Sequence, residues 1–186
     1  MDQRELVERA GRGDHDAFAA LAGASVARLE AVARLILRDR GLAQDAIQEV
    51  MVKAWRDLPG LRDPERFDAW LYRLTVNACL DAVRHRGRRV IEVDLATFDP
   101  PVATDLAARV ADRDLLERGF RHIGVDQRAI LVLHYYIGLP MPAMAEVLGI
   151  PLGTAQSRLH RALSALRAAL AADTRTPSHV REGQIA

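Results

Sequence analysis

The spacing of apolar side chains predicts helices along most of the chain. Between residues 18 and 37, apolar positions recur at steps of three and four residues or multiples of them, the period of a helix packed on one side. Gly41 is expected to end this helix. Two more helices are predicted, over residues 43–56 and 67–84, and the loop between them contains two prolines and a glycine.

The C-terminal third predicts a helix-turn-helix unit. An apolar helix is expected over Gln127–Tyr136, followed by a short helix over residues 142–148 and a tight turn at Gly149-Ile150-Pro151. A longer helix then runs from Leu152 to about Ala171, and this order is typical of the motif. With about 100° per residue, its inward positions are Leu152, Ala155, Leu159, Ala162 and Leu166.

Composition and charge indicate two small all-α domains joined by an acidic flexible linker. Only 5% of the 186 residues are aromatic, which suits helices packed through Leu, Val, Ile and Ala. Residues 90–117 are acidic, with 2 cations and 7 anions. The segments on either side are basic: residues 1–89 hold 16 cations and 14 anions, and residues 118–186 hold 8 cations and 4 anions. An acidic surface loop within one domain is the alternative. We predict an N-terminal domain at 1–89, a linker at 90–112, a helix-turn-helix domain at 113–172 and a disordered tail at 173–186.

The sequence contains none of the common enzyme or metal-site motifs considered below. Its one cysteine, Cys79, permits no internal disulfide, and we expect it to pack in a core. The six histidines lack ligand spacing, and phosphate-binding loops, G-x-S-x-G and H-E-x-x-H are missing. We therefore expect no catalytic site, no metal and no cofactor. With no signal peptide and no uncharged run of about 20 residues, no membrane insertion and a cytoplasmic location are expected.

Three helix faces are candidate binding surfaces. On the helix over residues 43–56, Asp45, Gln48, Glu49 and Val52 share one face. The pattern alone favours an ordinary solvated face, although an apolar Val52 among the polar residues is more typical of a docking surface. Along the next helix, one side carries Arg73, Asn77, Asp81 and Arg84, and the segment Arg84-His85-Arg86-Gly87-Arg88-Arg89 follows. This segment either complements the helix dipole or binds phosphates.

The outward face of the last helix is suited to DNA. Gln156, Ser157, His160 and Arg161 point outward, and Arg158 lies on the flank. Such side chains read base edges or hold phosphates, although a solvated helical hairpin is the alternative.

In their order along the chain, three motifs resemble the extracytoplasmic-function (ECF) group of bacterial sigma factors. The first is Asp45-x-x-Gln48-Glu49 with Trp55, similar to the helix that binds core RNA polymerase. The second runs from Phe67 to Asp81 and is similar to the helix that reads the −10 promoter element. The third, Leu148 to Ala162, is similar to the −35 recognition motif. The resemblance covers roughly residues 5–171 and implies a two-domain promoter-specificity subunit.

The resemblance implies a role for each face. Asp45, Gln48, Glu49 and Val52 would bind the clamp helices of the beta-prime subunit, and the beta flap is a further expected contact. The −10 element would be contacted by Arg73, Asn77, Asp81, Arg84, Arg86, Arg88 and Arg89, although Asp81 has the alternative of pairing with Arg84 or His85. The −35 element would be contacted by Thr154, Gln156, Ser157, Arg158, His160 and Arg161. Promoter DNA and an anti-sigma factor are the other expected partners.

Some positions depart from the family pattern. Gln156 and Leu163 stand where basic residues are usual, so the base preference is expected to shift and phosphate contact to weaken. Pro140 and Pro142 replace the usual cap and acidic first turn of the short helix. The alternative functions are a stand-alone helix-turn-helix regulator and a helical protein that mimics the sigma surface. The face around Asp45 argues against the regulator, which would have no use for it.

Overall fold

The computed structural model describes residues 2–87 and 117–173, and every regular element within these ranges is a helix. The all-α fold class is confirmed for these residues. The predicted linker, Arg88, Arg89 and residues 174–186 lie outside them. The elements are α1 (Gln3–Gly11), α2 (His15–Leu37), α3 (Arg40–Asp57), η1 (Leu58–Gly60), η2 (Pro64–Arg66), α4 (Phe67–Gly87), a helical stretch at 117–121, α6 (Val125–Leu131), the π-helical turn η3 (Val132–Tyr136), α7 (Met141–Leu148) and α8 (Leu152–Asp173).

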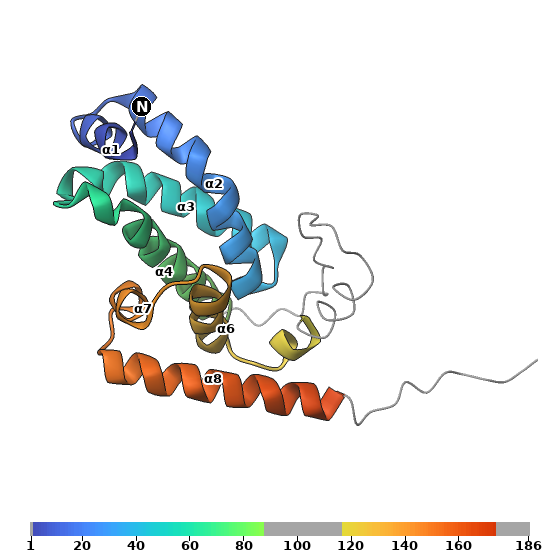
Figure 1. Ribbon diagram of the computed structural model, residues 1–186. Coiled ribbons are helices and arrows are strands. Elements are labelled where there is room, and N and C mark those ends of the chain that lie inside the picture. Colours follow the sequence, from blue (N-terminus) through green and yellow to red (C-terminus); the bar gives the residue numbers. More distant parts are fainter. Residues whose placement is uncertain (1, 88–116, 174–186) are drawn as a thin grey trace, which may run out of the picture.

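The N-terminal half is a bundle of α1 to α4 (Figure 1). Helix α2 starts where the Asp14 carboxylate accepts a hydrogen bond from the backbone N–H of Ala17 (3.0 Å), satisfying one of the amides that a helix start leaves unpaired. Helix α1 was not expected from the sequence, because only Val7 and Ala10 of its nine residues are buried. The bundle core is completed by fully buried side chains that include Leu29, Val32, Ile36, Val50, Leu71 and Val76.

The corner between α2 and α3 corrects one prediction. Gly41 does not end the first long helix, because that helix stops at Leu37 and Gly41 lies in the first turn of α3. The break occurs at Arg38, whose φ of 58° is in the left-handed region. The next residue, Asp39, caps α3 by accepting a hydrogen bond from the N–H of Leu42 (3.0 Å).

The C-terminal half contains the expected helix-turn-helix. Helix α7 ends at Gly149, whose φ of 64° suits glycine, and the N–H of Ile150 donates back to the carbonyl of Ala145 (3.0 Å). Helix α8 then begins at Leu152. The inward position predicted for Leu152 is wrong: 44% of this residue is exposed, because the core contacts of α8 begin one turn later at the buried Ala155.

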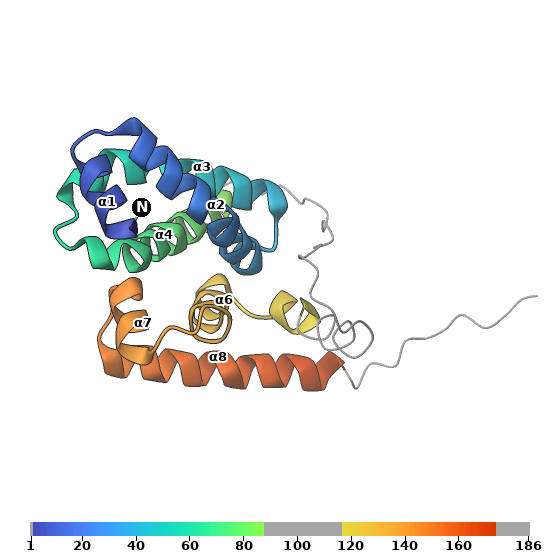
Figure 2. The same cartoon turned by 45° about the horizontal axis from the view of Figure 1, so that its top comes forward.

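The two halves pack against each other. Figure 2 shows the bundle of α1 to α4 as one layer above α6, α7 and α8. Helices α2 and α4 of the bundle contact α6, and α4 also contacts α7. Buried residues of both halves form one continuous hydrophobic cluster, from Leu29 and Leu71 to Ile130, Leu133 and Met144. The arrangement brings together surfaces of α4 and α7, two helices that lie far apart in the sequence.

Candidate functional site

Helix α3 separates a buried face from a fully accessible one. Ala46, Ile47 and Val50 point into the bundle core. The four residues predicted to share the opposite face are all exposed, and Val52 is the most exposed large apolar side chain of the described residues, at 67%. Lys53 Nζ lies 2.6 Å from the Glu49 carboxylate, one turn away. The face therefore combines one exposed apolar side chain, Val52, with polar and charged neighbours: Asp45, Gln48 and Glu49.

Helix α4 presents Arg73 and Asn77 to solvent. Its other sides are held in the core by residues that include Leu71, Val76 and Cys79. Thr75 is buried as well, and its hydroxyl donates to the carbonyl of Leu71 (2.9 Å), which satisfies the polar group inside the helix. The buried side chains of α4 hold the helix against the core. Arg73 and Asn77, which are predicted to contact the −10 element, remain accessible on its exposed side.

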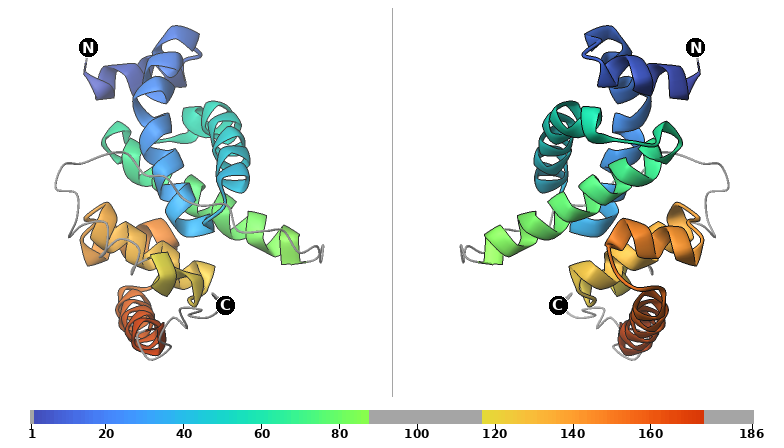
Figure 3. Two further views of the ribbon diagram at one scale, coloured as in Figure 1. Left: turned by 90° about the vertical axis from the view of Figure 1, so that its right-hand side faces the viewer. Right: turned by 90° about the vertical axis from the view of Figure 1, so that its left-hand side faces the viewer.

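The C-terminal end of α4 projects beyond the bundle (Figure 3). Arg84 is exposed there and pairs with Asp81, one turn back, at 3.0 Å. This is the alternative named for Asp81 from the sequence. Arg86 bridges to Asp39 at the start of α3 (2.8 Å), so both of these arginines, predicted to contact the −10 element, already hold intramolecular ion pairs.

Asp39 has a lowered pKa at this bridge. Burial alone would raise the pKa of its carboxyl, but hydrogen bonds from the Leu42 N–H and from Arg86 together outweigh burial and lower it. Asp39 therefore stays ionised and keeps the end of α4 beside the start of α3.

The exposed face of α8 carries the side chains predicted to contact the −35 element. Gln156, Ser157, Arg158, His160 and Arg161 are all exposed, and Thr154 is half-buried. Two of them bond back to the helix. The Ser157 hydroxyl donates to the Thr154 carbonyl (3.0 Å), and Arg161 Nε donates to the Ser157 carbonyl (3.3 Å). Ala155 and Ala162 are fully buried on the opposite side, so the helix is anchored with this polar face outward.

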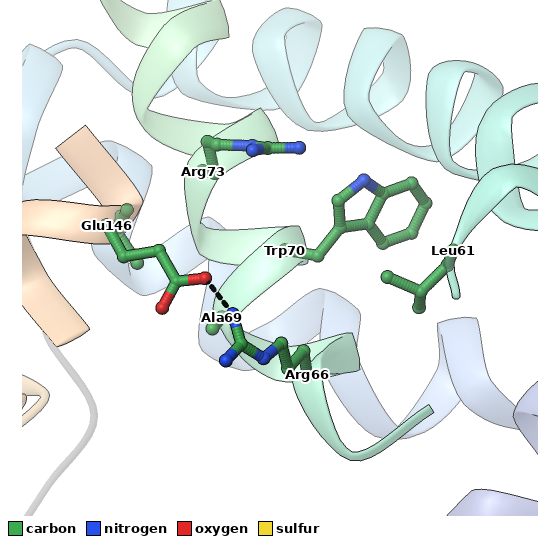
Figure 4. A pocket seen from close by; sticks show the side chains of 7 residues that line it. Leu61, Arg66, Ala69, Trp70, Arg73 and Glu146 are labelled. Carbon is green, nitrogen blue, oxygen red and sulfur yellow. Dashed lines mark hydrogen bonds and ion pairs between the residues drawn. The ribbon is translucent and has the colours of Figure 1, made fainter. Parts of the chain in front are cut away.

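A small cleft of about 110 Å³ lies where α4 meets α7 (Figure 4). Arg66 on the bundle forms an ion pair with Glu146 on α7 across it. Sequence reasoning missed this pair, because its partners are 80 residues apart. Arg73 lines the same cleft, together with Leu61, Ala69, Trp70 and Val147.

Other chemistry is not assembled in the described part of the chain. Residues 2–87 and 117–173 contain no group of three metal-ligating side chains and no helix long and apolar enough to cross a membrane. Cys79 is fully buried, and burial raises the pKa of its thiol to about 12. A neutral, inaccessible thiol is not a nucleophile, which agrees with the packing role expected from the sequence.

Two family models match the chain in order. Residues 21–89 match sigma-70 region 2, and residues 114–166 match sigma-70 region 4. The first match contains the α3 face and all of α4, and the second contains the helix-turn-helix through Leu166.

Curated proteins match nearly the whole chain. The RNA polymerase sigma-H factor of Pseudomonas aeruginosa is 31% identical over 179 residues, covering 90% of this chain and 93% of that protein. The ECF RNA polymerase sigma factor SigM of Mycobacterium tuberculosis is 33% identical over 162 residues, covering 87% and 81%. The ECF RNA polymerase sigma-E factor of Escherichia coli is 30% identical, covering 89% and 93%.

Solved structures agree with the fold. CnrH, solved in complex with the cytosolic domain of CnrY, is 28% identical with a TM-score of 0.63, and the match covers 92% of this chain and 98% of that one. The sigma factor RpoE of Bartonella quintana, solved with the anti-sigma factor NepR, shares the fold at a TM-score of 0.69 and 24% identity, over 84% and 98%. The resemblance found in the sequence is thus confirmed, and the chain belongs to the ECF group of RNA polymerase sigma factors.

Proposed function

We propose that the exposed face of α3 binds the clamp helices of beta-prime in core RNA polymerase, while α4 and α8 recognise the −10 and −35 promoter elements. As an ECF sigma factor, the chain directs promoter-specific transcription initiation. Its role is regulatory, and the polymerase supplies the chemistry. We assign core polymerase binding and −10 recognition to residues 1–89 and −35 recognition to residues 113–172, with 90–112 as the linker and 173–186 as a tail.

The exposed face of α3 carries the proposal. Val52 offers an apolar contact, and Asp45, Gln48 and Glu49 lie beside it on the same exposed face, a mixture of apolar and polar groups that suits a protein interface. A helix buried on its other side holds this face rigidly, so binding would require little ordering. A stand-alone regulator would have no partner for it.

The DNA-reading roles follow from accessible groups with suitable chemistry. Arg73 and Asn77 are exposed along α4, where they can contact phosphates and bases of an opened strand. Gln156 is exposed near the start of α8, and a glutamine amide pairs with adenine through two hydrogen bonds. The formal net charge of the chain is only +1, so we expect weak DNA binding without polymerase.

Partners and location extend the same proposal. CnrH was solved bound to the cytosolic domain of CnrY, and the Bartonella sigma factor was solved bound to an anti-sigma factor. By analogy, an anti-sigma protein is the expected inhibitor of this chain. The beta flap is the proposed contact of the C-terminal half, and the cytoplasm, where core polymerase works, is the proposed location.

The proposal is tested by adding a charge to the α3 face. Val52→Glu should weaken binding to sigma-free core polymerase at least tenfold, because a carboxylate would replace the apolar contact within the interface, a loss of about 1.4 kcal/mol or more. Ala24→Glu adds the same charge at an exposed position of α2 and serves as the control. Both variants are then tested in run-off transcription from a promoter library.

Discrete transcript starts that share a two-part upstream motif are expected from wild type and from the control. If wild type fails to bind core polymerase, the proposal is wrong. Tight, salt-insensitive binding of a palindromic duplex by the free chain would instead support the stand-alone regulator.

A further inference from the structure

We infer that Leu152, in the first turn of α8, is a base-reading residue that contacts the C5-methyl group of a thymine in the −35 element. The inference rests on the proposed function of α8 and adds the class of base that this turn selects. It concerns a side chain that the sequence pattern places in the core and the structure places on the surface.

Leu152 is exposed although the helix that follows it is well anchored. Of this residue, 44% is accessible, which makes it one of the few large apolar side chains exposed among the described residues. The buried positions of α8 begin one turn later, with Ala155 and then Ala162. A single exposed leucine requires no explanation on its own. Its position in the motif and its neighbours give this one a meaning.

The first turn of α8 is the part of a helix-turn-helix that meets DNA bases. Figures 1 and 2 show this end of α8 at the outer edge of the C-terminal half, where the turn joins it to α7. In this motif, the N-terminal residues of the second helix contact base edges in the major groove. Because the Cα–Cβ bonds of a helix tilt toward its N-terminus, the side chain of Leu152 extends toward that end.

The neighbouring Gly153 leaves the same turn without a side chain. It is exposed, its φ is not left-handed, and a Cβ added to it would meet no atom within 4 Å. The fold therefore does not require glycine here, although glycine within a helix is less favourable than alanine. A bare first turn lets a base edge come close to the helix backbone, which brings the bases within reach of Leu152.

Gln156 sets the expected position of the thymine. It is exposed one turn after Leu152, on the same side of the helix, and is proposed to pair with adenine. Four residues rise by about 6 Å along a helix, which is slightly less than two base-pair steps of roughly 3.4 Å each. The thymine is therefore expected within about two base pairs of the adenine that Gln156 reads.

Thymine is the base that an aliphatic side chain can recognise in the major groove. Among the four bases, it alone carries a methyl group at C5, and apolar side chains select it through contact with that methyl. The side chain of Leu152 has no hydrogen-bonding group, so it cannot read the donors and acceptors of the other bases. Contact with the methyl would remove apolar surface of both groups from water.

The experiment removes this methyl group alone. A promoter is first selected from a randomised library with the full-length protein and core polymerase. Each thymine of its −35 element, on both strands, is then replaced singly by deoxyuridine, which keeps the pairing edge and lacks the C5-methyl. At one position, the replacement should weaken binding by wild-type holoenzyme about threefold to fivefold, the ratio expected from burial of one methyl group.

Variants of Leu152 connect this loss to one side chain. Leu152→Ala should bind the thymine promoter about threefold to fivefold more weakly than wild type and show no further loss on the uracil promoter. Leu152→Met keeps an apolar contact and should keep the difference between the promoters. The matched control, Leu163→Ala, shortens a partly buried leucine of the same helix and should also keep it. A leucine with only a structural role would weaken binding to both promoters equally.

A variant of Gly153 tests the close approach independently. Gly153→Ala should keep or raise the thermal denaturation midpoint, because its Cβ meets no atom, yet weaken −35 binding by about threefold or more. The inference is wrong if this variant binds as tightly as wild type, if no uracil position weakens wild-type binding, or if Leu152→Ala responds to uracil as wild type does. In each of these cases the proposed function stands. If wild-type holoenzyme selects no two-part motif, the proposed function itself fails, and the inference with it.

Discussion

Arg128 is a polar side chain whose loss we expect to destabilise the protein, because it bonds to both halves. Its guanidinium donates to the carbonyls of Ile123 (2.6 Å) and Phe120 (3.2 Å) in its own half and to the carbonyl of Ile36 in the other. Arg128→Met keeps the apolar stem of the side chain but removes all of these donors. Three backbone acceptors would then lose their partner in a partly buried seam.

The magnitude follows from two opposing effects. A hydrogen bond that involves a charged group contributes about 1.5–3 kcal/mol, so three bonds set an upper range of several kcal/mol. Burial of the cation opposes this gain, as the lowered pKa of about 10 for Arg128 indicates, and the methionine avoids that cost. We expect the free energy of unfolding to fall by about 2–4 kcal/mol.

Urea denaturation followed by circular dichroism measures this change. The control is Arg167→Met, which makes the same replacement at an exposed position of α8 and should stay within about 0.5 kcal/mol of wild type. If Arg128→Met also stays within that range, the three carbonyl bonds contribute no net stability and the reasoning is wrong.

Three other predictions concern single positions. Gln156→Arg should change the preferred base at one −35 position from adenine to guanine, because arginine pairs with the acceptor edge of guanine; selection from a randomised −35 library with holoenzyme checks this, and an unchanged consensus contradicts it. Gly119→Ala should lower stability by about 1–3 kcal/mol, because its Cβ would lie 2.6 Å from a Leu166 methyl carbon. Gly23→Ala, with open space around its Cβ, should instead be neutral or stabilising, and equal thermal denaturation midpoints would refute the contrast. Cys79 should resist alkylation in the folded protein. The pKa of its thiol is about 12 in the fold and about 9 when unfolded, so its contribution to stability should be complete below pH 9 and be lost between pH 9 and 12. Urea titrations of wild type and Cys79→Ala across this pH range would measure the loss.

Local signals were sufficient for the helix-turn-helix. Gly149 after an apolar helix indicated the turn, and its left-handed backbone is what glycine permits. The α3 face was also predictable from spacing alone, because the residues opposite the buried Ala46 and Val50 had to be exposed. Exposure does not assign a role, so the polymerase and promoter contacts of these residues remain predictions.

The failures arose where distant residues decide the local structure. Arg38 breaks α2, and its bond to the carbonyl of Glu117 joins residues 79 positions apart, so Gly41 was the more plausible end from sequence alone. Leu152 fits the inward period of α8, but the first turn of the helix extends past the core. The Arg66–Glu146 pair was invisible for the same reason, since no periodicity connects positions in two different halves.

The two tryptophans lie in different environments, so their intrinsic fluorescence can report on the cleft between the halves. Trp55 stacks on His15 with ring centroids 4.4 Å apart and belongs wholly to the N-terminal bundle. Trp70 lines the cleft between the halves and would exchange protein for water when they part. The steady-state emission of a Trp55→Phe protein, measured without polymerase as urea is added, would therefore report when that cleft is lost, with no dye attached to either half.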